Sequence, residues 1–238
     1  MKLTIDIGNT KAKIALFEGK KILFNECVKC LDLKTVQKFV GNKQVAATII
    51  SSVKQPDASV IKISRYYNAT FLNEHTNIPL SLNYKNPSLL GNDRLAAAVG
   101  AYFLFKEKDV IIIDSGTCLT IDLLAKNGKF IGGRISPGID MRYNSMYNFT
   151  EKLPLVTKNK IVPKIGNDTN TSILSGVQKG ILAEIESAVL AYRDIKPSAI
   201  ILLTGGDYLY FEKELKSSIF VNPNLVLIGL NEILDFNE

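Results

Sequence analysis

Two short segments of the chain carry the same order of residue types, and those types suit phosphate and cation binding. In this 238-residue sequence, "DIGNT" begins at Asp6 and "DSGT" begins at Asp114, each after an apolar run. Glycine allows close approach of another group, and neighbouring backbone N–H groups can point at an anion. Aspartate and threonine oxygens suit a metal ion or its water. One such motif is weak evidence, because turns use the same residues, but two at matching places predict a phosphate-binding site.

Each motif lies at the tip of the first hairpin of a three-stranded meander. The alternating apolar runs predict strands at 2–7, 12–17 and 21–28, and again at 109–116, 118–125 and 130–136. Helices and strands alternate after each meander, so the sequence predicts an internal duplication of an α/β half. In such folds ligands bind beyond the carboxyl ends of strands, which is where both motifs fall.

Other segments complete the expected order of elements. Residues 75–91 are polar and contain prolines, so they predict a loop, and the alanine-rich 92–106 predicts a strong helix. The segment 171–195 predicts a long helix. "LLTGGD", at 202–207, predicts a strand that ends in a glycine turn, and 225–236 predicts a strand tail followed by a helix.

Composition limits the class of protein. The chain is 46% hydrophobic and 22% charged, with a net charge of +6, and its lysines are scattered among acids. That pattern favours a solvated basic surface, or attraction for a small anion, over a nucleic-acid interface. No apolar run approaches the roughly 20 residues that span a bilayer, and the start lacks the pattern of a signal peptide. We therefore expect a cytoplasmic protein with no nucleic-acid or membrane partner.

The cysteines and the single histidine do not predict a metal or redox site. Cys27 and Cys30 form a C-x-x-C pair, but the only other candidate ligands of this kind are Cys118 and His75. Buried or half-buried thiols and a surface-loop histidine are the simpler interpretation.

The ordered motifs resemble the signatures of type III pantothenate kinases, from Lys2 to about Asp207. The segments are "DIGNTKAK", "NPSLLGNDRLAA", "DSGTCLTIDLLAKNGKFIGGRISPG", "YNFTEKLPLV" and "LTGGD". "GNDR" before an alanine-rich helix is the specific element, and the others are shared more loosely across the acetate kinase, sugar kinase, Hsp70 and actin superfamily.

The resemblance implies an α/β fold of two RNase H-like (actin-like ATPase) halves, each a mixed five-stranded sheet with helices. The active site would lie in the cleft between them. The halves would be 1–109, with the ATP phosphate loop and a substrate motif within 84–105, and 110–238. The family phosphorylates the primary hydroxyl of pantothenate with ATP, the first step towards coenzyme A. The resemblance also implies Mg²⁺ with ATP, a monovalent cation (K⁺ or NH₄⁺) and a homodimer with substrate sites near its interface.

The same resemblance assigns roles to residues of this chain. Asp93 stands where the family has its proton acceptor, Asp114 where it has a monovalent-cation ligand, and Asp6 beside the Mg²⁺, directly or through water. The ATP-binding residues would be Asp6, Ile7, Gly8, Asn9, Thr10, Lys11, Ala12, Lys13 and Thr117. The substrate-binding residues would be Tyr84, Gly91, Asn92, Asp93, Arg94 and Thr169. Thr171 is close enough to Thr169 to leave the register between them open.

Some positions depart from the family pattern or allow a second interpretation. Cys118 replaces a usual alanine, and "RLAAA" lacks an asparagine often found two residues after Arg94. Asp93 could also be the N-cap of the following helix. Arg94 could be a surface residue paired with a carboxylate, or an anchor for an anion. The apolar residues from Leu95 to Phe105 could form a dimer interface or belong to the core.

Two other functions share parts of this pattern. A kinase of the same superfamily could act on a different small hydroxyl substrate, but those enzymes lack "GNDR" at this place. A non-catalytic relative that serves as a transcriptional accessory protein should have lost a loop residue or the base. Asp6, Lys13 and Asp93 are all present here. Turnover of ATP with pantothenate, with sugars and with neither separates the three.

Overall fold

The computed structural model describes residues 1–215 and 217–238, which form two compact units. Unit 1 contains Met1–Glu107, Lys126–Ile131 and Asn224–Glu238, and unit 2 contains Lys108–Ala125 and Gly132–Pro223. The expected boundary after residue 109 stays a prediction, and unit 1 also includes the C-terminal helix. Among the described residues, every helix is too short or too polar to cross a lipid bilayer.

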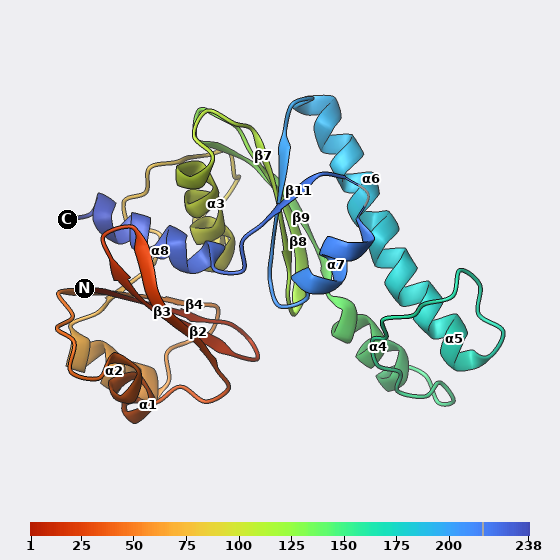
Figure 1. Cartoon of the computed structure of the whole chain (residues 1–238), viewed down its shortest axis with the longest axis horizontal. Coiled ribbons are helices and arrows are strands. Elements are labelled where there is room, and N and C mark those ends of the chain that lie inside the picture. The colour runs from red at the N-terminus through yellow and green to blue at the C-terminus, as the bar shows by residue number, and fades with distance from the viewer. Residues whose placement is uncertain (216) are drawn as a thin grey trace. The chain divides into compact units, whose positions relative to one another are not determined.

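Unit 1 is built on a five-stranded mixed sheet in the order β3-β2-β1-β4-β5 (Figure 1). Its strands β1, β2 and β3 form an antiparallel meander, and β4 and β5 run parallel to their neighbours. The bounds are β1 Lys2–Ile7, β2 Ala12–Glu18, β3 Lys21–Val28, β4 Ala47–Ser52 and β5 Thr70–Phe71. The predicted meander is confirmed, with its third strand at the expected residues.

Helices α1 (Leu33–Val40) and α2 (Ala58–Tyr67) pack on one face of this sheet. Asp32 and Asp57 cap them by accepting hydrogen bonds from backbone N–H groups three residues on. Their buried valines and isoleucine meet Leu3 and Ile5 of β1 in the core. The alternation of β1 therefore leaves its even-numbered residues, Asp6 included, on the opposite face.

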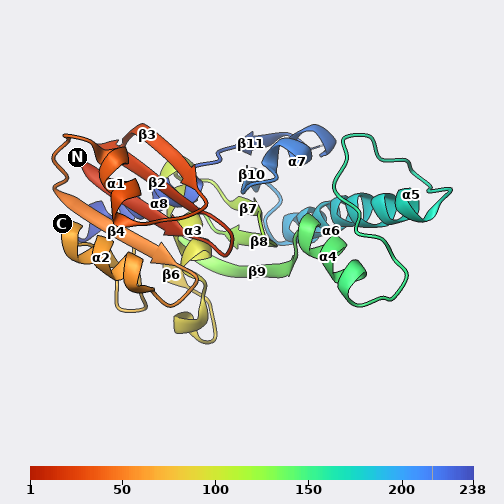
Figure 2. The same ribbon diagram turned by 90° about the horizontal axis from the view of Figure 1, so that it is seen from below.

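The opposite face is covered by α8 (Leu225–Phe236), which packs against α3 (Asn92–Leu104) (Figures 1 and 2). The two helices cross at glycines, because a Cβ at Gly229 would lie 1.7 Å from the Ala96 carbonyl oxygen. The apolar residues of α3 from Leu95 to Ala101 are buried, so this part of the helix belongs to the core.

The prediction of a strand tail at the start of 225–236 was wrong, because the whole segment is helical. Lys2 and Lys20 hold this helix to the sheet through ion pairs with Asp235, and Lys2 also pairs with Glu238. Burial alone would lower the pKa of Lys2, but the bonds to Asp235 and Glu238 outweigh it and raise the pKa.

The second sheet has six strands in the order β11-β10-β7-β8-β9-β6. Five of them repeat the topology of the first sheet, with β7 antiparallel to β8 and parallel to β10, which is parallel to β11. The bounds are β7 Val110–Ser115, β8 Cys118–Leu124, β9 Lys129–Pro137, β10 Ile200–Thr204 and β11 Ile219–Val221. The predicted duplication is confirmed.

The sixth strand, β6 (Ser81–Leu82), lies within the segment predicted as loop and pairs with Lys129 and Phe130 of β9. A 3₁₀ turn, Pro87–Leu89, also lies there. The expectation of five strands in the second sheet missed this one because two residues are too few to show alternation.

The helices of unit 2 are α4 (Ile139–Asn148), α5 (Thr169–Leu174), α6 (Gly180–Ile195) and α7 (Tyr208–Glu214). Helices α5 and α6 are continuous through a π-helical turn, Ser175–Lys179, and form the long helix predicted for this region. Residues 149–168, between α4 and α5, contain neither helix nor strand and lie beside the end of this helical run (Figure 2).

The close α3–α8 crossing gives a test of the fold. Gly229→Ala should destabilise the protein by about 1–3 kcal/mol, the usual cost of overpacking, because the added methyl meets backbone. Gly180→Ala, at a helical position with open space, should stabilise it by up to about 1 kcal/mol. Urea unfolding of both variants measures this; equal effects would contradict the crossing.

Candidate functional site

The first hairpin of unit 1 brings an acid and a lysine side by side at the carboxyl end of β1. Asp6 lies directly opposite Lys13, and the pairing ends at Ile7 and Ala12. The four residues of the tip form a turn in which the Gly8 N–H donates to the Lys11 carbonyl at 3.0 Å. Opposite residues of an antiparallel pair share a face, so the carboxylate and the ammonium flank the base of this turn.

The second hairpin is related but shorter. In unit 2 Asp114 lies opposite Thr120, six residues on, whereas Asp6 and Lys13 are seven apart. Its tip is closed by a hydrogen bond from Gly116 N–H to the Cys118 carbonyl at 3.0 Å. The exposed Thr117 lies at this tip. The second hairpin thus places threonine where the first places lysine.

Helix α4 begins against this second tip. A Cβ at Gly138 would lie 2.3 Å from the Gly116 carbonyl oxygen, and the Gly138 N–H donates to the Thr117 carbonyl at 3.1 Å. Only glycine fits such an approach, so the "SPG" that precedes α4 fixes the helix start beside the hairpin.

The "LLTGGD" turn also meets the end of β7. Thr204 pairs with Asp114, and Gly205 has a φ of +97° that favours glycine. The Asp207 N–H donates to the Ser115 carbonyl at 2.9 Å, and Asp207 pairs with Lys158 at 2.5 Å. Burial acts to lower the pKa of Lys158, but the bond to Asp207 outweighs it and raises the pKa. Unit 2 therefore gathers three polar turns around Asp114, and sequence reasoning missed the lysine.

The "GNDR" motif begins α3 in unit 1, at the carboxyl end of β4. The Asn92 side chain donates to the carbonyls of Leu72 at 3.0 Å and Ser52 at 3.5 Å. Ser51 and Ser52 end β4 beside Asp6 and Ile7 of the parallel strand β1. Because Asn92 binds the Ser52 carbonyl, the start of α3 lies at the same edge of the sheet as the turn Gly8–Lys11 after β1. The fold thus brings Asp93 and Asp6 to one edge.

The alternative that Asp93 caps α3 was wrong. The helix begins at Asn92, with Gly91 at the N-cap position and no side-chain cap. The Asp93 carboxylate instead accepts a hydrogen bond from the Arg94 N–H at 2.8 Å and is partly exposed. The side chain is therefore held at the helix start with a surface that a ligand can reach.

Arg94 is not a surface residue, because only 5% of it is exposed. Its guanidinium carbon lies 5.8 Å from the ring centres of both Tyr84 and Phe130, and Nη1 donates to the Tyr84 hydroxyl at 3.4 Å. Strand β6 positions this group, since the Asn83 N–H donates to the Phe130 carbonyl at 2.9 Å. A buried cation beside two aromatic rings suits an anion or a polar substrate.

Ser51 is a polar residue of this edge that sequence reasoning missed. It is fully buried and lies beside Asp6, and within the described residues its hydroxyl has no hydrogen-bond partner. Its neighbourhood depends on the pairing of β1 with β4, which no local pattern reveals.

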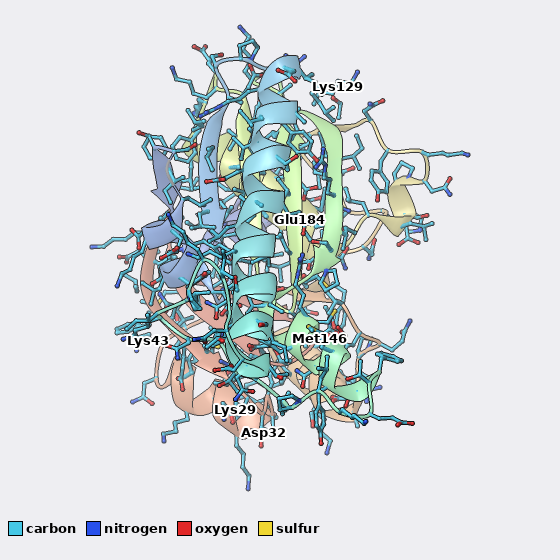
Figure 3. The ribbon with its side chains drawn as sticks, turned by 90° about the vertical axis from the view of Figure 1, so that its right-hand side faces the viewer. Lys29, Asp32, Lys43, Lys129, Met146 and Glu184 are labelled. Atoms are coloured by element: carbon cyan, nitrogen blue, oxygen red, sulfur yellow. The ribbon has the colours of Figure 1, made fainter. Side chains whose placement is uncertain are left out.

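Thr169 lines an open cavity of about 650 Å³ in unit 2, with residues of α4, α5 and the π-turn. Met146, which Figure 3 labels on α4, is one of the residues that line this cavity. Met146 lies eight residues after Gly138 along α4, which corresponds to a rise of about 12 Å along the helix axis. Thr171 is engaged elsewhere: its hydroxyl and the Asp168 carboxylate form a reciprocal cap at the start of α5. The geometry therefore favours Thr169 over Thr171 for contact with a ligand.

The expectation of buried or half-buried thiols was wrong for two of the cysteines. Cys27 and Cys30 are exposed and free, and over residues 1–215 and 217–238 no three His, Cys, Asp or Glu side chains gather to hold a metal ion. A divalent ion beside the turn after β1 would need phosphate oxygens together with a single carboxylate such as Asp6, an arrangement common for Mg²⁺.

The comparisons with known proteins converge on one family. The family model described as "Type III pantothenate kinase" matches residues 2–191. A type III pantothenate kinase of Azobacteroides pseudotrichonymphae is 41% identical, over 100% of this chain and 98% of the relative. One of Cytophaga hutchinsonii is 42% identical over 100% of both chains.

Solved structures share the fold. A putative Baf family transcriptional activator of Campylobacter jejuni superposes with a TM-score of 0.67 at 22% identity, covering 99% of this chain and 98% of its own. A putative 2-dehydro-3-deoxygalactonokinase of Sinorhizobium meliloti gives 0.60 at 11% identity, covering 98% of each chain. At these identities the likeness shows the actin-like and sugar-kinase fold alone.

Proposed function

The chain belongs to the type III pantothenate kinase family and phosphorylates pantothenate with ATP in coenzyme A biosynthesis, and we propose which residues perform each part of this reaction. The observation that carries the proposal is the fixing of α3 by Asn92, which supports Asp93 and Asp6 acting at one edge of the sheet.

The turn after β1 binds the ATP phosphates. Its backbone N–H groups and Lys13 supply positive potential, and Asp6 lies on the same face, suited to Mg²⁺ directly or through water. Bound Mg²⁺ neutralises phosphate charge, which is most of what phosphoryl transfer needs. The ATP-binding set is Asp6, Ile7, Gly8, Asn9, Thr10, Lys11, Ala12 and Lys13, with Thr117.

Asp93 accepts the proton of the pantothenate hydroxyl. An unactivated alcohol loses its proton late, as the new bond forms, and a carboxylate within hydrogen-bond reach can accept it then. Arg94 and Tyr84 lie beside it and suit the anionic end of the substrate or the moving phosphoryl group. Gly91 and Asn92 complete this part of the substrate site, and Thr169 contributes a contact in the cavity of unit 2.

Asp114 binds the monovalent cation, K⁺ or NH₄⁺. It lies partly buried at the end of β7, beside the backbone oxygens of the hairpin tip and the glycine turn. Carboxylate and carbonyl oxygens are the ligands that such a hard cation prefers. In this proposal the half 1–109 carries the ATP phosphate loop, and the half 110–238 carries the cation ligand Asp114.

We also propose a cytoplasmic homodimer that uses unit 2 for its interface. Phe149, Ile161 and Ile165 are 87%, 83% and 86% exposed, close in sequence to the cavity that Thr169 lines. Exposed apolar side chains gathered in one segment are typical of association surfaces.

Asp93→Asn separates catalysis from structure. The amide oxygen can still accept from the Arg94 N–H, so stability should fall by no more than about 1 kcal/mol. Turnover should fall roughly 10²- to 10⁴-fold, the usual contribution of a general base. Pantothenate binding should weaken much less. Coupled-assay kinetics, calorimetric binding and thermal unfolding on one preparation decide it; near-normal turnover would remove Asp93 as the base.

Asp114→Asn tests the cation site. Loss of the charge should raise the potassium concentration needed for half-maximal activity, while cooperative unfolding is kept. Asp194→Asn, an exposed acid at the end of α6, is the matched control and should leave that concentration unchanged. Potassium titration of both variants gives the answer, and an unaltered dependence in Asp114→Asn would exclude this role.

The dimer proposal predicts a mass in solution of twice the 26.3 kDa of one chain. Phe149→Lys should shift this towards the monomer, because a charge cannot be buried in an apolar interface without cost. Tyr66→Lys, at a 61% exposed position of unit 1, should leave the mass unchanged. Light scattering after size exclusion measures all three, and a monomeric parent protein would refute the proposal.

A further inference from the structure

The helical run from α5 to α6 contains a π-turn, Ser175–Lys179, and two of its residues, Gly176 and Val177, line the cavity of unit 2. π-turns are rare in proteins and occur often at functional sites. The roles proposed above leave this turn without a function.

Gln178, in the π-turn, holds the segment 149–168 through a buried amide. It is fully buried, and its amide oxygen accepts from the Asn159 N–H at 2.9 Å while its amide nitrogen donates to the Asn159 carbonyl at 2.9 Å. The same oxygen accepts from the buried Tyr143 hydroxyl of α4 at 2.9 Å. Burial raises the pKa of Tyr143, so its hydroxyl keeps the donated proton.

Two further contacts fix the segment downstream of Asn159. The Ser175 hydroxyl, also in the π-turn, donates to the Lys164 carbonyl at 3.0 Å. A Cβ at Gly166 would lie 2.2 Å from the Ser172 nitrogen, so the backbone passes directly against α5 there. Gln178 and Ser175 of the π-turn thus hydrogen-bond the segment at two points. Gly166 allows a third contact, in which the segment packs directly against α5.

The segment needs such anchors because it has no regular structure of its own. Its residues 149–168 contain no helix or strand, yet Leu153 and 166–168 from it form part of the cavity wall, just before Thr169. Ordering so long a connection costs conformational entropy that regular hydrogen bonds do not offset here. Side-chain bonds to its backbone therefore decide whether the wall is formed.

We propose that Gln178 is a positioning residue for substrate binding, which holds the segment 149–168 in place as one wall of the pantothenate cavity. The proposal rests on the proposed function, in which Thr169 contacts pantothenate from this cavity. An amide is suited to the role, since one side chain satisfies both backbone groups of Asn159. Gln178 itself lines no part of the cavity and acts through the segment.

Gln178→Met keeps an unbranched side chain of similar size and removes all three hydrogen bonds. We expect the KM and the calorimetric Kd for pantothenate to rise about tenfold, with the KM for ATP within about twofold. Trypsin should cleave after Lys158 and Lys160 at least tenfold faster than in the parent protein, because the segment opens more often. If Gln178 had a merely structural role, Gln178→Met would lower Tm but leave the pantothenate KM, the pantothenate Kd and the rate of tryptic cleavage unchanged.

Tyr143→Phe is the matched control. It removes the second donor to the amide oxygen but leaves both bonds to Asn159, so pantothenate affinity and tryptic cleavage should not change. Ser175→Ala, which loses only the Lys164 contact, should show a smaller rise of about two- to threefold. It supplies the test if Gln178→Met does not fold. An effect of Tyr143→Phe equal to that of Gln178→Met, or none in Ser175→Ala and Gln178→Met, would overturn the proposal.

Thr169→Val separates this proposal from the one on which it rests. If its pantothenate affinity is unchanged, the cavity is not the substrate site and the assignment of Thr169 fails. If Thr169→Val weakens binding while Gln178→Met alters neither binding nor cleavage, the site stands and the positioning role fails.

Discussion

The register in which β1 pairs with its neighbours governs where unit 1 presents its charged groups. Asp6 lies opposite Lys13 on one side and beside Ser51 on the other. A shift of one residue would turn Asp6 towards the core that α1 and α2 cover, where an uncompensated carboxylate is costly. The apolar Leu3 and Ile5 of the same strand pack into the core with α1 and α2, so the register that places them there leaves Asp6 on the other face. Packing of the core thus fixes the position of the turn after β1, the proposed phosphate-binding turn.

The same architecture is used twice with different chemistry. Both units pair an aspartate at the end of their first strand, but its neighbour is lysine in unit 1 and threonine in unit 2. The seven-residue spacing gives a longer turn beside Lys13, while the shorter one leaves Asp114 among backbone oxygens. We propose that the first arrangement binds phosphate and the second binds a cation.

Glycines set the close approaches around these tips. Gly138 and Gly205 let α4 and the turn after β10 reach the end of β7, and Gly229 lets α8 pack directly on α3. The α8 contact matters for the site because α3 begins with "GNDR" and is held at its start by Asn92. Loss of packing far from the chemistry would thus move Asp93, although the helix itself forms locally.

The sequence by itself determined the duplicated α/β order, the two meanders and the acidic turn of each. Alternation and capping are local properties, and Asp32 and Asp57 cap their helices as short-range chemistry requires. The ordered motifs also predicted the family, which the comparisons confirmed.

Only the tertiary structure decided which distant residues meet. The two-residue β6 is too short to show a pattern, yet its pairing with β9 brings Tyr84 and Phe130 together beside Arg94. The burial of Ser51, the reach of Lys158 to Asp207 and the bonds of Gln178 to Asn159 likewise depend on long-range packing. The start of 225–236 was predicted as a strand tail because α8 is apolar on nearly every side, and the helix is buried against both the sheet and α3. Periodicity reports which face of an element is buried, and it carries no signal when every face is.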